Sequence, residues 1–195
     1  MKKVLLLGDS IRMNYQDYVK ELLKDECEVI FALDNGRFAA YTLWQMNQMF
    51  RHNDGIALVH WNNGYWDMNI EPPMTEAVHP LPEYLHYLRR IANYIKDHGA
   101  KTIFATTIPI VRDGHALDTT GTSAGLMFRN EWVVEYNEAA KKLMGELNVP
   151  VNDLYELCYD ESKNHYKCDD LLHLSEEGKR RCAEQVAQMI REHLK

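Results

Sequence analysis

Short apolar runs recur along the chain and predict the strands of a buried sheet. The first run, Val4 to Leu7, lies between two lysines and Gly8. Four consecutive apolar residues without polar alternation are typical of a strand that is buried on both faces. Similar runs predict four further strands, at residues 27–33, 56–61, 101–108 and 149–152.

Between these runs, apolar residues recur at helical spacing. They predict helices over residues 15–23, 40–50, 84–95 and 132–147, and a last helix after Ser175. We expect Asn14 to cap the first helix. Glu176 and Glu177 would lie in the first turn of the last helix, where negative charge is favourable.

Strands that alternate with helices predict a parallel sheet with right-handed crossovers. We therefore expect one domain over residues 1–195, an α/β protein with a three-layer α/β/α sandwich and a five-stranded, flavodoxin-like parallel sheet. Two segments stand apart from this pattern. Residues 62–82 contain four prolines and no clear periodicity. Residues 111–130 are glycine-rich and too long for a simple connection, so we expect them to line a site.

Composition narrows the classes of partner. The chain has 195 residues, of which 46% are hydrophobic and 26% charged, and its net charge is -7. An acidic protein is not attracted to nucleic acid or to an anionic membrane surface, so neither partner is expected. No apolar run approaches the roughly 20 residues of a membrane span.

The amino-terminal apolar run is too short for a signal peptide. If the chain starts at its native terminus, we expect a cytoplasmic protein; a leader removed earlier would leave no trace. The four cysteines have no C-x-x-C spacing and are expected to be reduced thiols. The alternative is a disulfide between Cys158 and Cys168 in an exported protein.

Candidate site residues follow the first three predicted strands. Ser10 comes after the first strand, Gly36 after the second and Asn62 after the third. The carboxyl ends of parallel strands share one edge of a sheet, where open α/β sheets bind ligands. A serine at this edge is well placed to act as a nucleophile, although most serines after a strand are only turn or cap residues.

A nucleophilic serine needs a base, and the segment before the last helix offers one. Asp170 and His173 are three residues apart on a predicted turn. At this spacing the carboxylate can reach the near ring nitrogen, fix the tautomer and leave the far nitrogen free to accept the serine proton.

Four blocks of the sequence resemble the SGNH (GDSL-type) hydrolase family. They are Gly8-Asp9-Ser10, Gly36, Asn62 and Asp170-x-x-His173, in family order and over nearly the whole chain. The resemblance implies Ser10 as nucleophile, His173 as general base and Asp170 as its orienting acid. It also implies an oxyanion hole formed by the backbone N–H groups of Ser10 and Gly36 and the side-chain amide of Asn62.

Two of the blocks depart from the common pattern. The serine block continues Ser10-Ile11-Arg12, without the leucine of the shorter signature. The third block reads Asn62-Asn63, so that Asn63 competes for the role of oxyanion donor. We prefer Asn62 because it follows the strand directly. Asp9 is expected to shape the turn by accepting backbone hydrogen bonds.

Several nearby side chains are candidates for substrate contacts. Trp61, Tyr65 and Trp66 would stack on a sugar ring or an acyl chain, or else belong to a lid or the core. Arg37 would bind an anionic group or lie in solvent. His115, in the long loop, is a further candidate.

Other histidines and acids offer weaker alternatives. His60 ends a buried strand and is interpreted as a core residue. A metal cluster is not expected, because the spacings match no familiar zinc pattern; its ligands would be His165, Cys168, Asp169, Asp170 and His173. No cofactor is expected either, since Asp9 places an acid where a bound phosphate would need backbone N–H groups.

These observations favour a serine esterase that hydrolyses small acyl esters through an acyl-enzyme. The aromatic loops lean towards O-acetyl groups on carbohydrate. The resemblance also leaves open a lysophospholipase, a thioesterase or an acyltransferase. A catalytically silent relative that binds a carbohydrate or a protein partner is the alternative from another class. The sequence does not predict the oligomeric state.

Overall fold

The computed structural model describes residues 1–195 except 72, 111–114, 118–125, 161–164, 169 and 171, and the side chains of residues 115–117, 126 and 127 lie outside the description as well. The strands of its main sheet are β1 (Lys3–Leu7), β2 (Glu28–Phe31), β3 (Ile56–Asn62), β4 (Lys101–Ala105) and β7 (Val151–Asn152). The helices are α1 (Ser10–Leu22), α2 (Ala39–His52), α3 (Tyr65–Met68), α4 (Leu81–Asp97), α5 (Asn130–Glu146), α6 (Leu154–Tyr159) and α7 (Glu176–His193).

All five strands of this sheet run parallel, in the order β2-β1-β3-β4-β7. The strand β1 lies inside the sheet, where Leu5 is paired with Ile30 on one side and with Val59 on the other. Its residues from Val4 to Leu7 are completely buried, as expected for a strand covered on both faces. The five predicted strands are thus confirmed, several of them with narrower bounds.

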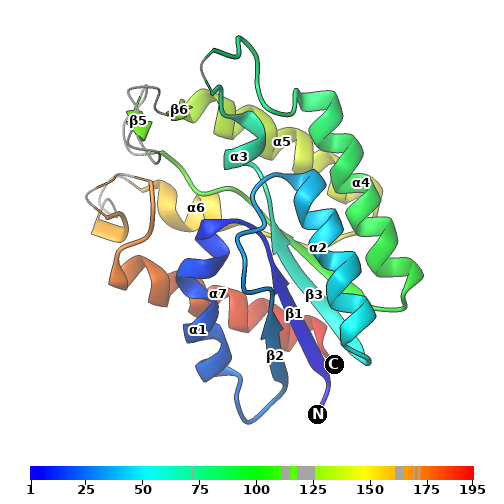
Figure 1. Cartoon of the computed structure of the whole chain (residues 1–195). Coiled ribbons are helices and arrows are strands. Elements are labelled where there is room, and N and C mark those ends of the chain that lie inside the picture. The colour runs from blue at the N-terminus through cyan, green and yellow to red at the C-terminus, as the bar shows by residue number, and fades with distance from the viewer. Residues whose placement is uncertain (72, 111–114, 118–125, 161–164, 169, 171) are drawn as a thin grey trace.

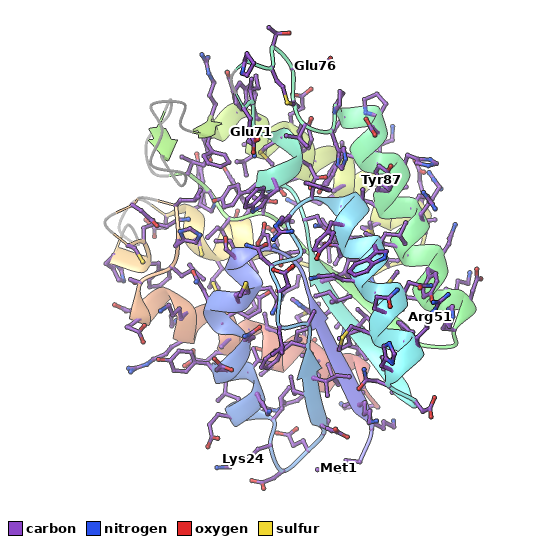
Figure 2. The ribbon with its side chains drawn as sticks, in the orientation of Figure 1. Met1, Lys24, Arg51, Glu71, Glu76 and Tyr87 are labelled. Atoms are coloured by element: carbon purple, nitrogen blue, oxygen red, sulfur yellow. The ribbon has the colours of Figure 1, made fainter. Side chains whose placement is uncertain are left out.

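Helices cover both faces of the sheet, which confirms the three-layer architecture (Figure 1). One face is covered by α1 and α7, and the other by α2, α4 and α5. Both chain termini lie at the end of the sheet where the strands begin. Met1 and Lys24 mark this end, and Glu71 and Glu76 project at the opposite end (Figure 2). The strand-end residues predicted from the sequence therefore lie at the end marked by the two glutamates.

The structure differs from the prediction in the irregular segments. The proline-rich stretch contains the short helix α3, and α6 was not predicted at all. The long loop contains an antiparallel pair, β5 (His115–Leu117) and β6 (Leu126–Phe128). These elements are too short to give a periodic pattern in the sequence.

The start of the first helix is also corrected. The helix begins at Ser10, and the side chain of Asp9 caps it by accepting a hydrogen bond from the Ile11 N–H at 2.9 Å. Asn14, predicted as the cap, lies inside the helix. Aspartate and asparagine are equally good caps, so capping preference alone does not distinguish a helix that starts after Asp9 from one that starts after Asn14. The helix starts after Asp9 because the chain turns directly at the end of β1.

His60 is a core residue, as the sequence suggested. Its side chain is fully buried in β3, and its Nε2 accepts a hydrogen bond from the Asn152 side chain at 3.0 Å. Burial lowers the pKa of His60 to about 3. The imidazole is therefore neutral in the folded protein at every pH at which a base would be needed.

This burial makes folding sensitive to acid. An unfolded chain binds a proton at this histidine below about pH 6.5, whereas the folded protein does so only near pH 3. The free energy of unfolding should therefore fall as the pH drops through this window, at about 1.4 kcal/mol per unit of pKa difference. We expect His60→Gln to remove this component in acid-unfolding experiments, because its amide can still accept from Asn152 and does not titrate.

The matched control is His52→Gln, which changes an exposed imidazole at the end of α2. Its acid dependence should follow that of the wild type. An unchanged acid dependence in His60→Gln would show that His60 can be protonated without unfolding.

Candidate active site

The turn after β1 is shaped so that Ser10 opens the first helix. Gly8 has a φ of +134°, which L side chains rarely adopt, and a Cβ atom there would lie only 2.1 Å from Asn62 Oδ1. Only glycine allows the chain to turn this close to β3. Ser10 is the first residue of α1, where a backbone N–H has no acceptor within the helix. Both its hydroxyl and its N–H are therefore available to a ligand.

Asp170 lies on a tight turn before the last helix. Its Oδ1 accepts hydrogen bonds from the backbone N–H groups of Leu172 at 2.9 Å and His173 at 2.8 Å. Partial burial raises the pKa of Asp170, but the hydrogen bonds from the His173 side chain and these two N–H groups outweigh it, so that the pKa lies below its ordinary value. Near neutral pH this carboxyl group is ionised and can only accept.

Three side chains from distant parts of the chain form a line of hydrogen bonds. The Nδ1 of His173 lies 2.6 Å from Asp170 Oδ2, and its Nε2 lies 2.8 Å from Ser10 Oγ. Because the carboxylate is an acceptor, Nδ1 carries the hydrogen in the neutral ring. The Nε2 atom then accepts the hydrogen bond of the Ser10 hydroxyl. This is the arrangement needed to remove a proton from a serine.

The turn that carries His173 is fastened on several sides. The Leu174 N–H donates to Asn14 Oδ1 at 3.0 Å, and the Cys168 N–H donates to the His173 carbonyl at 2.8 Å. Inside the turn, Lys167 Nζ donates to the Leu172 carbonyl at 2.9 Å. Neither Asn14 nor Lys167 was predicted from the sequence as a support of the site. The four-residue spacing of Ser10 and Asn14, which places both on one helix face, was the available signal for Asn14.

Asn62 ends β3 beside the serine turn. Its side-chain Nδ2 donates to Asp9 Oδ1 at 2.8 Å, and both residues are almost completely buried. Burial raises the pKa of Asp9, while the Asn62 and Ile11 hydrogen bonds act in the opposite direction. An amide nitrogen carries two hydrogens, so one Asn62 N–H is left over from the bond to Asp9.

The neighbouring Asn63 has a different environment. Its Nδ2 donates to the Arg37 carbonyl at 3.0 Å and to Thr42 Oγ1 at 2.9 Å, which uses both of its hydrogens. Arg37 has a φ of +47°, a strained conformation for a residue with a side chain. The Asn63 amide thus holds a strained turn in place, and this bonding favours Asn62 over Asn63 as the donor to a ligand.

Gly36 requires a correction. Its N–H donates to the Gly8 carbonyl at 2.8 Å, so this hydrogen is already used and is not free for an oxyanion in this conformation. A Cβ atom at Gly36 would lie 2.5 Å from the Gly8 oxygen. The glycine is needed here because two strand ends approach each other through their backbones.

Two of the three candidate aromatic residues are core residues. Trp61 is fully buried, packs edge-on against Phe104 and donates to Thr102 Oγ1 at 2.9 Å. Tyr65 is 2% exposed, and its hydroxyl donates to the Ile108 carbonyl at 2.6 Å. Neither can stack on a substrate in this structure, so the core alternative holds. Trp66 is half-buried and stays a candidate.

Arg37 and His115 are the two remaining candidates for substrate contacts. The Arg37 side chain is half-exposed, lies over the Tyr41 ring and approaches Asp34 at 3.5 Å. This pairing leaves a guanidinium at the surface that is already partly neutralised. His115 lies in β5, and its side chain is outside the described residues.

The described residues contain no group of three or more His, Cys, Asp or Glu side chains that could hold a metal ion. Of the metal ligands considered from the sequence, Asp169 lies outside the described residues, and His165 instead approaches Glu177 at 3.3 Å. None of the four cysteines, all of which the structure describes, forms a disulfide, and the Cys158 sulfur lies 3.8 Å from that of Cys182. No helix in the described parts of the chain is long and apolar enough to cross a membrane.

The fold of this chain is shared by solved structures described as a lipase/acylhydrolase, an acetyl xylan esterase and a GDSL-like lipase. A lipase/acylhydrolase from Enterococcus faecalis has a TM-score of 0.77 at 19% identity over 100% of this chain and 98% of its own. The acetyl xylan esterase AlAXEase has a TM-score of 0.75 at 19% identity over 96% of this chain and 99% of its own. A GDSL-like lipase from Bacteroides thetaiotaomicron has a TM-score of 0.75 at 16% identity over 98% and 88%.

The sequence comparison points to the same family. The chain is 30% identical over 116 residues to the GDSL esterase/lipase WDL1 of Oryza sativa subsp. japonica, a match that covers 58% of this chain and 45% of the rice protein. The chain therefore matches less than half of that relative's length. No family model matches the chain. The resemblance predicted from the four sequence blocks is confirmed, and at the identities of the solved structures their likeness establishes the fold.

The support of the His173 turn by Asn14 can be tested directly. Asn14→Ala removes the acceptor of the Leu174 N–H and should reduce the free energy of unfolding by about 1 kcal/mol, the usual worth of one hydrogen bond. Amide hydrogen exchange at residues 172–175 should become faster. Asn14→Asp is the matched control, because its carboxylate keeps an acceptor oxygen and should preserve protection. Equal exchange in the alanine variant and the wild type would exclude Asn14 as a support.

Proposed function

We propose that this protein is a serine esterase that hydrolyses acyl esters, with Ser10 as nucleophile, His173 as general base and Asp170 as the acid that orients the imidazole. The single observation that carries the proposal is the line of hydrogen bonds from Asp170 through His173 to the Ser10 hydroxyl, at 2.6 and 2.8 Å. Of the three groups in this line, the Ser10 hydroxyl is the one that can attack an acyl carbon.

In the first step the Ser10 oxygen attacks the ester carbonyl while His173 Nε2 accepts its proton. The imidazolium that forms is stabilised by Asp170, whose lowered pKa keeps it ionised. The tetrahedral intermediate then collapses, and His173 returns the proton to the departing alcohol. In the second step a water molecule, deprotonated by the same Nε2, attacks the acyl-enzyme. The bond from the acyl carbon to Ser10 Oγ then breaks, His173 returns the proton to Ser10, and the acid is released.

The negative charge on the attacked oxygen needs hydrogen-bond donors. We assign two: the Ser10 N–H, at the start of α1, and the Asn62 N–H that Asp9 does not use. Donors fixed before the reaction stabilise the charge without having to reorganise. Gly36 would add a third donor only if its N–H left the Gly8 carbonyl.

We propose esters of short acyl groups as substrates, with O-acetyl groups on carbohydrate as the first candidate. One solved structure with this fold is named an acetyl xylan esterase, and others are named lipases or acylhydrolases. Acyl length is therefore the property to measure first. A silent binding protein is disfavoured, because it would have no need for an aligned acid, base and hydroxyl.

The proposal predicts hydrolysis of p-nitrophenyl esters, fastest for the acetyl or another short acyl group. Ser10→Ala should lower kcat by at least about 10³-fold, because loss of a nucleophile leaves only the contribution of binding and the oxyanion donors. The measurement is the release of p-nitrophenol across a series of acyl lengths. An organophosphonate should label Ser10 in the wild type only.

Hydrolysis at the same rate by Ser10→Ala would falsify the proposal. No activity on any ester, with no labelling of Ser10, would favour the binding protein instead. Fastest hydrolysis of long acyl chains would replace the short-acyl assignment by a lipase or thioesterase type.

The two adjacent asparagines should have separable roles. Asn62→Ala removes the proposed oxyanion donor and should lower kcat by about 10²–10³-fold, the usual effect of losing one such donor. Asn63→Ala removes the bonds to Arg37 and Thr42 and should lower Tm while affecting kcat much less. Kinetics measured well below both unfolding transitions, with Tm measured in parallel, decide between them. A larger loss of kcat in Asn63→Ala would reverse the assignment.

A further inference from the structure

Arg12 is a buried cation two residues after Ser10. Its side chain is completely buried in α1, although arginine is almost never buried unless it is paired. Burial lowers the pKa of Arg12, while the negative charges of Asp9 and Asp34 raise it; the group keeps its charge at neutral pH. Placing a charge in a protein interior is costly, so an apolar side chain would be the simpler residue at this position for packing alone.

The guanidinium group connects the ends of two strands. Its NH1 donates to the Ala32 carbonyl at 2.9 Å, and its NH2 donates to the carbonyls of Asp34 at 2.9 Å and Gly8 at 3.3 Å. A further bond joins NH1 to Gln16 Oε1, one helical turn along α1. Ala32 and Asp34 lie just after β2, and Gly8 lies just after β1. One planar group therefore fixes three backbone oxygens at once.

These contacts converge on the turn that presents the nucleophile. The Gly8 carbonyl accepts from Arg12 and also from the Gly36 N–H at 2.8 Å, so it is held from two sides. The Gly8 oxygen is two residues from Ser10, whose N–H is a proposed oxyanion donor. Any shift of residues 32–36 away from Gly8 would be passed to this turn.

We propose that Arg12 is a positioning residue, which holds residues 32–36 against the Gly8 carbonyl and thereby sets the position of Ser10 and its N–H. This inference rests on the proposed esterase function. Arg12 does not touch the substrate; it acts through the backbone. A lysine cannot replace it, because a single ammonium group lacks the planar fork that reaches carbonyls on both strands.

The test compares Arg12→Met and Arg12→Lys with the wild type. Both replacements fill similar space, but methionine has no donor and lysine has one donor centre. We expect kcat for the best p-nitrophenyl ester to fall by about 10²-fold in Arg12→Met, the effect of misplacing a reacting group by about 1 Å, with KM changed less than about twofold. Arg12→Lys should fall between the methionine variant and the wild type.

A second readout separates positioning from a general loss of stability. Amide hydrogen exchange at residues 32–37 should become faster in Arg12→Met, while exchange in α4 and α5 stays as in the wild type. Tyr15→Phe is the matched control, since it removes a buried hydroxyl from the same helix and touches none of the three carbonyls. Its kcat and its exchange at residues 32–37 should be unchanged.

The outcomes are distinguishable. An active wild type with full kcat in folded Arg12→Met overturns the role of Arg12 and leaves the esterase intact. A fall in kcat without faster exchange at residues 32–37 overturns it as well. If Arg12→Met does not fold, the same two criteria apply to Arg12→Lys. A wild type that hydrolyses no ester contradicts the proposed function itself.

Discussion

The buried carboxylate of Asp9 is the interaction on which the site depends. Its Oδ1 accepts from the Ile11 N–H, which starts α1, and from the Asn62 amide, which ends β3. One oxygen atom thus ties the start of a helix to the end of a neighbouring strand. Burial raises the pKa of Asp9, and the hydrogen bonds from Asn62 and Ile11 oppose this effect only in part. Asp9 therefore fixes the Asn62 amide relative to the start of the helix that carries Ser10.

The first helix organises the loops around it through its two sides. Ser10 and Asn14 are one helical turn apart and face the segment that carries His173. The Ser10 hydroxyl contacts the His173 side chain, and Asn14 Oδ1 accepts a hydrogen bond from the Leu174 N–H. Arg12 lies on the opposite side and contacts the backbone after β2. Residues two apart on a helix point in nearly opposite directions, so a single turn of helix reaches two separate segments. Ser10, Arg12 and Asn14, with the contacts that they make, therefore lie on one rigid element.

The sheet and the approach of Asp170 to His173 could be predicted from the sequence because both have local signatures. Strands buried on both faces, such as β1, are continuous apolar runs, and Asp170 and His173 are close enough in sequence to meet on one turn. The roles of Asn62, Asn63 and Gly36 could not be read in the same way. Their donors are directed by partners far along the chain, such as Asp9, Thr42 and Gly8. The burial of Trp61 and Tyr65 likewise depends on strands and loops that pack against them.

Sequence periodicity also failed to predict the elements that are very short. The helix α3 and the pair β5 and β6 have too few residues for a periodic pattern, so tertiary contacts decide their conformation. The alternative starts of α1, at Asp9 or at Asn14, were equally good by capping preference. The end of the preceding strand resolved the choice, because the chain turns directly at Gly8.

The hydroxyl and the imidazole of the proposed triad are 163 positions apart in sequence. During synthesis, the amino-terminal strands and helices can pair long before the last segment leaves the ribosome. Ser10 would then already sit at its sheet edge, but with no base beside it. In the proposed enzyme, the group that removes the serine proton would therefore be added last, after the sheet that carries Ser10 has formed.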